Sequence, residues 1–234
     1  MNHLERTKKS RGLVVVGKPE RKLTLIDRIF KLWLSTSRNI DGLWLGTSED
    51  KPYPASQRIE EALLLIKRHD PLNYSRIIGN LDRIWVSLLP SALAHYDRSL
   101  NACVFDERHV VQETTTIEWI ASTIVHETTH ARLDGWGIIY HEKDRYRIEA
   151  ICLRREMNFL AKLPDAGPLR EEVARTLEWC ATDRDFLSDA SFQERHDRGE
   201  VEILRHLNVP RCFVRLALWV IWRRRLRAFA SAKP

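Results

Sequence analysis

The feature that most constrains this chain is the segment Val125–Ala131, which contains the pattern His-Glu-x-x-His. The surrounding residues, Thr116–Leu133, include no glycine or proline, and apolar residues recur among them at intervals of three and four. This periodicity predicts an amphipathic helix with one side packed in a core. Because a helix turns about 100° per residue, His126, Glu127 and His130 share the other face, with the two imidazoles one turn apart.

Two imidazoles at this spacing can bind one metal ion, and a carboxylate beside them can take a proton from a metal-bound water. Zinc lowers the pKa of such a water to about 7, so that hydroxide is available at neutral pH. We therefore predict that His126 and His130 bind Zn²⁺ and that Glu127 is the general base. The threonines at 114–116 are suited to cap the start of the helix, and Asp134–Gly137 is suited to end it.

A catalytic zinc site needs a third protein ligand and keeps its fourth position for water. The best candidate in the sequence is Glu149, near the start of a second expected helix that begins close to Asp144. Asp134, one helical turn after His130, and His141 are the alternatives. The sequence therefore predicts two histidine ligands and a third protein ligand, with Glu149 favoured and Asp134 and His141 left open.

Between Arg83 and Leu160 the sequence resembles the zincin metallopeptidases, and within them the gluzincins, whose third ligand is a glutamate on a later helix. The resemblance implies hydrolysis of peptide bonds in a peptide or protein substrate. Many gluzincins carry an aspartate one turn after the ligand glutamate, where this chain has Leu153. The metzincin branch is excluded, because its glycine and third histidine would stand at Leu133 and Trp136.

A zinc peptidase also needs a donor for the oxyanion that forms when hydroxide attacks a carbonyl. Tyr140, His141 and Tyr146 follow the first metal-binding helix and are the candidates in this sequence. We predict Tyr146 as the catalytic residue, because it lies one turn before Glu149 on the same face of the second helix.

The pattern of elements predicts an α+β fold, a mostly helical zincin-like domain with a small mixed or antiparallel sheet before the His-Glu-x-x-His helix. Strands are expected at Arg83–Leu89, Asn101–Phe105 and His109–Val111, the last two forming a hairpin, while Ala92–Tyr96 extends the sheet. Loops are expected at Asp41–Gly42 and from Gly46 to Pro54. Other helices are expected at 23–35, 55–69, 169–186 and 191–207, the last broken at Gly199. The resemblance implies that an edge strand pairs with an extended substrate.

The net charge of +6 is unevenly distributed along the chain. Residues 1–23 carry +5 and residues 201–234 carry +7, so the middle of the chain carries −6. We predict a basic, flexible N-terminal arm at 1–22, a catalytic domain at 23–210 and an apolar, basic C-terminal helix at 211–234.

The C-terminal helix contains an apolar run, Cys212–Trp222, followed by an arginine cluster. This run is too short to span a bilayer, which needs about 20 residues. Because it is apolar on nearly every side, we expect it to be buried. The alternatives are a peripheral contact with an anionic membrane or with a partner protein. Nucleic acid is not favoured, because no recognised binding motif accompanies the arginines.

The four cysteines have no paired spacing, which indicates buried thiols in a reducing compartment. The short apolar patch near the N-terminus is too short for the core of a signal peptide. We therefore expect a cytoplasmic protein, with membrane association through the C-terminal helix as the alternative. Two other functions stay open beside a zinc peptidase. One is a zinc-dependent hydrolase of a non-peptide amide, and the other is a non-catalytic membrane-binding or partner-binding protein with a vestigial metal site.

Overall fold

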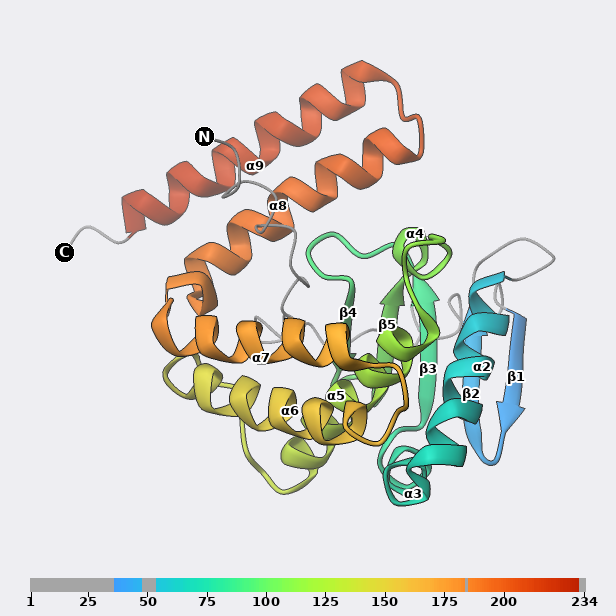
Figure 1. Cartoon of the computed structure of the whole chain (residues 1–234). Helices are drawn as coiled ribbons and strands as arrows, with labels where there is room; N and C mark the ends of the chain where they lie inside the picture. The colour runs from blue at the N-terminus through green and yellow to red at the C-terminus, as the bar shows by residue number, and fades with distance from the viewer. Residues whose placement is uncertain (1–35, 48–53, 184, 232–234) are drawn as a thin grey trace, which may run out of the picture.

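The computed structural model describes residues 36–47, 54–183 and 185–231. The predicted N-terminal arm at 1–22 and the predicted helix at 23–35 lie outside these residues. The expected α+β class is confirmed: helices dominate, and a small five-stranded mixed sheet precedes the His-Glu-x-x-His helix (Figure 1).

The sheet has the strand order β1-β2-β3-β5-β4, so β4 is an edge strand. Strands β2, β3 and β5 run parallel, whereas β1 and β4 run antiparallel to their neighbours. A turn with Asp41 and Gly42 at positive φ joins the first two strands. The strands are β1 (Thr36–Ile40), β2 (Leu43–Thr47), β3 (Arg83–Ser87), β4 (Ala94–Asp97) and β5 (Ala102–Asp106).

Two sequence expectations for the sheet are wrong. The expected strand His109–Val111 falls largely within a short helix, α4 (Glu107–Val110), because the Asp106 carboxylate accepts a hydrogen bond from the Arg108 backbone N–H at 3.2 Å and caps its start. The antiparallel partner of β5 is therefore β4 and not the segment after it. The start of the expected loop at Gly46 belongs to β2, because glycine there allows the Trp85 ring of β3 to approach closely.

Helices α2, α3 and α6 pack directly against α5, which carries the His-Glu-x-x-His pattern. Helix α3 was not predicted from the sequence. It starts directly after α2, because Asp70 caps it by accepting a hydrogen bond from the Asn73 N–H. The helices are α2 (Pro54–His69), α3 (Pro71–Asn80), α5 (Ile117–Gly135), α6 (Arg145–Leu160), α7 (Gly167–Thr182), α8 (Asp189–His206) and α9 (Arg211–Ser231).

Helix α5 is the centre of the fold. It begins where the Thr116 hydroxyl accepts a hydrogen bond from the Trp119 N–H at 3.1 Å, as its sequence predicts. Every residue from Trp119 to Ala131 is buried. The apolar side packs on α2, α3 and the sheet, and α6 covers the face that carries the histidines. The polar face of this helix is thus inside the protein.

The last two helices form a hairpin that projects beyond α7 (Figure 1). The expectation that the C-terminal helix is buried is wrong, because large apolar side chains of α9 are about half exposed; they are Phe213, Leu216, Leu218 and Trp219. Cys212 is also exposed, whereas the other three cysteines are buried as expected. Within the described part of the chain, no helix combines the length and the apolar character needed to cross a bilayer.

Gly199 fixes how the hairpin meets the rest of the protein. Helix α8 runs unbroken through this residue, contrary to the expected break, and Gly199 is buried. A Cβ atom at this position would overlap the carbonyl group of Pro90, in the loop between β3 and β4. The helix backbone can therefore lie against that loop only because residue 199 has no side chain.

We expect Gly199→Ala to lower the free energy of unfolding by about 1–3 kcal/mol or to release the hairpin, because the clash is with backbone and cannot be relieved by a rotamer change. The measurements are thermal denaturation and limited proteolysis between α7 and α9. The control is Gly79→Ala in α3, where a Cβ meets no atom within 4 Å. Equal stability and protease resistance of both variants would contradict this packing.

Candidate metal centre

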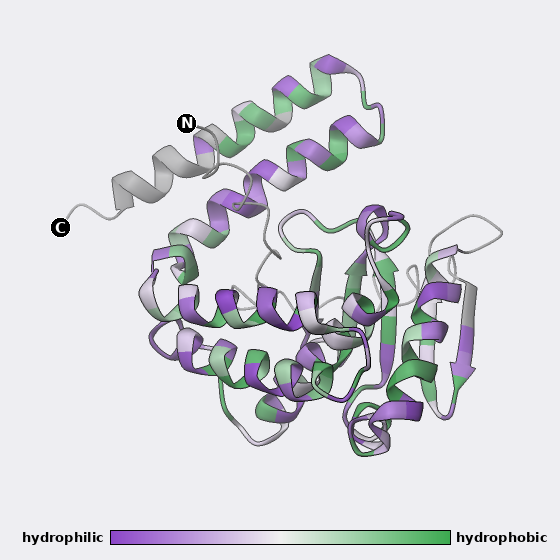
Figure 2. Cartoon of the chain, viewed as in Figure 1, coloured by the Kyte–Doolittle hydropathy of each residue, from purple (hydrophilic) through white to green (hydrophobic). Residues whose placement is uncertain are grey.

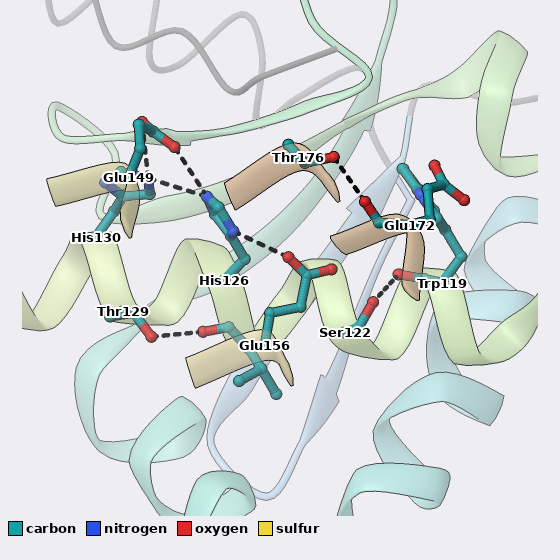
Figure 3. Close-up of polar contacts among 10 residues, drawn as sticks. Trp119, Ser122, His126, Thr129, His130, Glu149, Glu156, Glu172 and Thr176 are labelled. Atoms are coloured by element: carbon teal, nitrogen blue, oxygen red, sulfur yellow. Dashed lines mark hydrogen bonds and ion pairs between the residues drawn. The ribbon is translucent and has the colours of Figure 1, made fainter. Parts of the chain in front are cut away.

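The two histidines of α5 meet at one point in the interior. The Nε2 atoms of His126 and His130 are 3.3 Å apart, and both side chains are buried (Figure 3). Their ring centroids are 5.1 Å apart. The predicted pairing of the imidazoles across one helical turn is therefore present, with both nitrogen atoms directed at the same small volume.

Glu149 reaches this volume from α6. One of its carboxylate oxygens lies 3.4 Å from His126 Nε2, and the other lies 3.5 Å from His130 Nε2. The residue is fully buried, and Figure 3 shows its carboxylate next to both rings. Of the three sequence candidates for a third ligand, Glu149 is the one that contacts both histidines. Asp134 pairs with Arg98 at 3.1 Å, and His141 is exposed.

A second donor from α6, Cys152, also faces the histidines. The ligand atoms of His126, His130 and Cys152 all lie within 4.8 Å of one another, and all three residues are buried. Cys152 follows Glu149 by almost one turn, so both side chains lie on the face of α6 that packs on α5. The sequence indicated a buried thiol here but not a thiol beside the histidines. The structure thus offers a buried group that could hold a metal ion, with two candidates for the third donor.

Glu156 holds the far side of His126. Its Oε2 lies 3.2 Å from His126 Nδ1, which leaves Nε2 of the same ring directed at the centre (Figure 3). Glu156 lies seven residues after Glu149, two full turns along α6, and therefore on the same face. Leu153, which stands where many gluzincins have an aspartate, packs in the core instead. This contact was missed in the sequence, although the seven-residue spacing of two glutamates was a signal for it.

Tyr140 is the tyrosine that contacts the centre. Its hydroxyl donates a hydrogen bond to Oε1 of Glu149, and its ring stacks edge-on against His130 with centroids 5.4 Å apart. Tyr146, which the sequence favoured as the catalytic residue, accepts a hydrogen bond from Arg147 at 2.8 Å. The catalytic role of Tyr146 stays a prediction. The Tyr140 hydroxyl lies closer to the histidines and Glu149 than the sequence suggested.

Glu127 is buried next to the histidines. Among the described residues, neither of its carboxylate oxygens has a hydrogen-bond partner of good geometry. Burial raises the pKa of Glu127 to about 8, with Glu149 and Glu156 adding to the rise. His126 and the backbone N–H of Tyr96 in β4 oppose it. A buried carboxylate with this pKa is suited to take up and release a proton near neutral pH.

The charges of the buried histidines and glutamates favour a positive charge between the two imidazoles. Burial alone would lower the pKa of His126, but hydrogen bonds with Glu149 and Glu156 and the charge of Glu127 raise it to about 10. Burial lowers the pKa of His130 to about 4, and the neighbouring His126 adds to this. Buried carboxylates without a counter-charge are costly, so a cation bound between the imidazoles fits these residues. The oxygen of Glu149 that lacks a hydrogen-bond donor supports the same conclusion.

Neither a model of a known protein family nor a curated protein matches this chain. The interpretation of the site therefore rests on its own residues and on their geometry.

We expect Glu156→Gln to weaken divalent metal binding about 10- to 100-fold, the usual cost of removing a carboxylate that orients a ligating histidine. The measurement is a competition titration with a chromophoric chelator. The control is Glu171→Gln, an exposed position on α7. Unchanged affinity in Glu156→Gln with a native circular dichroism spectrum would show that the contact with His126 does not position the ring.

Proposed function

We propose that the protein is a zinc-dependent hydrolase that cleaves peptide bonds, with His126, His130 and Glu149 as the ligands and Glu127 as the general base. The observation that carries the proposal is the convergence of two imidazole nitrogens 3.3 Å apart with carboxylate oxygens 3.4 and 3.5 Å away. Two nitrogen donors and one carboxylate oxygen form a common catalytic set for Zn²⁺. This is also the set that the gluzincin resemblance implies.

The ion would supply two effects at this place, activation of a water molecule and polarisation of a carbonyl group. The remaining steps belong to the protein. Glu127 takes a proton from the attacking water and passes it to the leaving amine, a role for which its pKa near 8 is suited. Glu156 fixes the His126 ring so that Nε2 faces the centre. Tyr140, whose hydroxyl lies at Glu149, is our preferred donor to the developing oxyanion.

We propose that the substrate backbone pairs with strand β4. It is one of the two edge strands of the described sheet, and the backbone N–H of its residue Tyr96 lies near enough to Glu127 to affect the pKa of that carboxylate. An extended peptide paired along this edge would bring a scissile carbonyl close to the general base. A non-peptide amide, the alternative substrate, would not need to pair with this strand.

A closed, non-catalytic metal site is the second candidate, and one observation favours it. Cys152 offers a thiol to the same histidines, and a set of two histidines, one carboxylate and one thiolate would fill the four positions of zinc. Glu127 and Glu149 have no exposed surface in this structure, as is usual for a structural site. The two candidates differ in whether a position stays open for water.

We expect Glu127→Gln to lower peptide hydrolysis about 10²- to 10⁴-fold while zinc content stays stoichiometric, because the general base is lost and the ligands are kept. The assay is a set of quenched fluorescent peptides together with elemental analysis of the same sample. Glu118→Gln, on the first turn of α5, is the control on the same helix. Undiminished hydrolysis in Glu127→Gln would show that Glu127 is not the general base.

Cobalt substitution separates the two candidate ligand sets. We expect Co²⁺-loaded protein to lack the intense near-ultraviolet charge-transfer band of a cobalt–thiolate bond, because Glu149 and not Cys152 completes the catalytic set. Glu149→Ala should then lose tight metal binding and Cys152→Ala should keep it. Cys180→Ala, a buried thiol on α7, is the control for loss of packing. A strong thiolate band that disappears in Cys152→Ala would favour the closed site.

A further inference from the structure

Helix α9 presents an apolar face that the described part of the chain does not cover. It contacts α8, and on α9 Ile221 is buried and Val214 is half-buried. On its outer side Phe213, Leu216 and Trp219 are 57%, 54% and 47% exposed. Figure 2 shows hydrophobic residues recurring along the coloured first half of α9, the helix of the hairpin that lies farther from the domain.

The three exposed side chains form a continuous stripe. They are spaced three residues apart, so each follows the previous one by nearly a full turn on one side of the helix. A stripe that includes a tryptophan and a phenylalanine on a projecting helix is unusual for a free surface. Phe213, Leu216 and Trp219, together with the arginines next to them, form what we call the outer face of α9.

The charge of α9 has a single sign. Between Arg211 and Ser231 the sequence contains six arginines and no aspartate or glutamate. Arg211, Arg215 and Arg223 are exposed, and the Arg223 guanidinium lies over the Trp219 ring, 4.6 Å from its centroid. The basic groups are thus adjacent to the apolar stripe, and the face is complementary to a surface that is both apolar and anionic.

Three other occupants fit the outer face less well than a membrane does. A second copy of the chain would bring the arginines of one α9 against those of the other. The N-terminal stretch 1–23 carries +5 and would be repelled in the same way. Nucleic acid would pair with the arginines but would leave Leu216 and Phe213 without an apolar contact. A bilayer with anionic headgroups satisfies both features.

We propose that the outer face of α9 is a docking surface for a membrane that contains anionic lipids. Phe213, Leu216 and Trp219 enter the boundary between the headgroups and the acyl chains, and the arginines contact lipid phosphates. The helix then lies parallel to the membrane plane, and the α8–α9 hairpin holds the catalytic domain beside it. This proposal is independent of the proposed hydrolase activity.

The test is co-sedimentation of the full-length protein with vesicles of phosphatidylcholine, with and without phosphatidylglycerol. We expect binding to the anionic vesicles, weakening as salt is raised because screening shortens the reach of the arginines. Leu216→Asp should weaken binding about ten-fold or more, since an exposed apolar side chain loses its burial in lipid. Arg215→Glu should weaken it about five-fold or more.

Two control variants make the same changes, a leucine to aspartate and an arginine to glutamate, at exposed positions outside α9. Leu64→Asp replaces a leucine that is 64% exposed on α2, and Arg154→Glu reverses an exposed charge on α6. Neither should alter vesicle binding. Because Leu216 and Arg215 are exposed, their variants should keep the native circular dichroism spectrum. The Trp219→Phe variant should lose the blue shift in fluorescence that the wild-type protein shows on anionic vesicles.

Three outcomes would overturn the proposal. The first is equal binding, or no binding, to vesicles with and without phosphatidylglycerol. The second is vesicle binding that Leu216→Asp and Leu64→Asp affect equally. The third is a concentration-dependent dimer, or a complex with duplex DNA, that depends on Arg215 while vesicle binding does not.

Discussion

The contact between α5 and α6 is the interaction on which the rest of the candidate centre depends. Helix α5 supplies the two imidazoles and Glu127, and α6 supplies Glu149, Cys152 and Glu156. Neither helix alone brings three donors to one point. The spacing of four residues on one helix and of three and seven on the other places each group on the shared face, so that packing of the two helices assembles the site.

This contact is electrostatically demanding. Two helices can pack through apolar side chains alone, and replacing buried charges by such side chains is often neutral or stabilising. Here three glutamates and two histidines occupy the interior, and the pKa values of Glu127 and His126 are both raised as a result. Clustered groups with strongly shifted pKa values are more frequent at functional sites than elsewhere. The pattern marks this buried cluster as a group that could hold a metal ion.

The sequence predicted those features that depend on local periodicity. The extent of α5, its cap at Thr116 and the pairing of the histidines all follow from spacing along one helix. It also placed Glu149 near the histidines as the favoured third ligand, and the carboxylate does lie beside both rings. It missed the contacts of Glu156 and Tyr140 with the centre, because a contact between two elements depends on how each is rotated about its axis. One sequence does not specify that rotation.

The errors in the sheet and at the C-terminus have the same kind of origin. Asp106 can end a strand or cap a helix, and the cap at the start of α4 decided the outcome for residues 107–110. The apolar composition of α9 indicated burial. Composition shows that a helix favours burial, but it does not show whether another element is available to cover it. In the described part of the chain, α8 covers one side of α9 and leaves the side with Leu216 exposed.

The close approach of Gly199 to Pro90 has a mechanical consequence. Pro90 belongs to the segment that leads into β4, and the amide of Tyr96 in that strand lies near Glu127. The backbone of the hairpin therefore lies directly against the segment that leads into β4, with no side chain of residue 199 between them. A side chain at residue 199 would therefore displace the loop that leads into this edge strand as well as the hairpin.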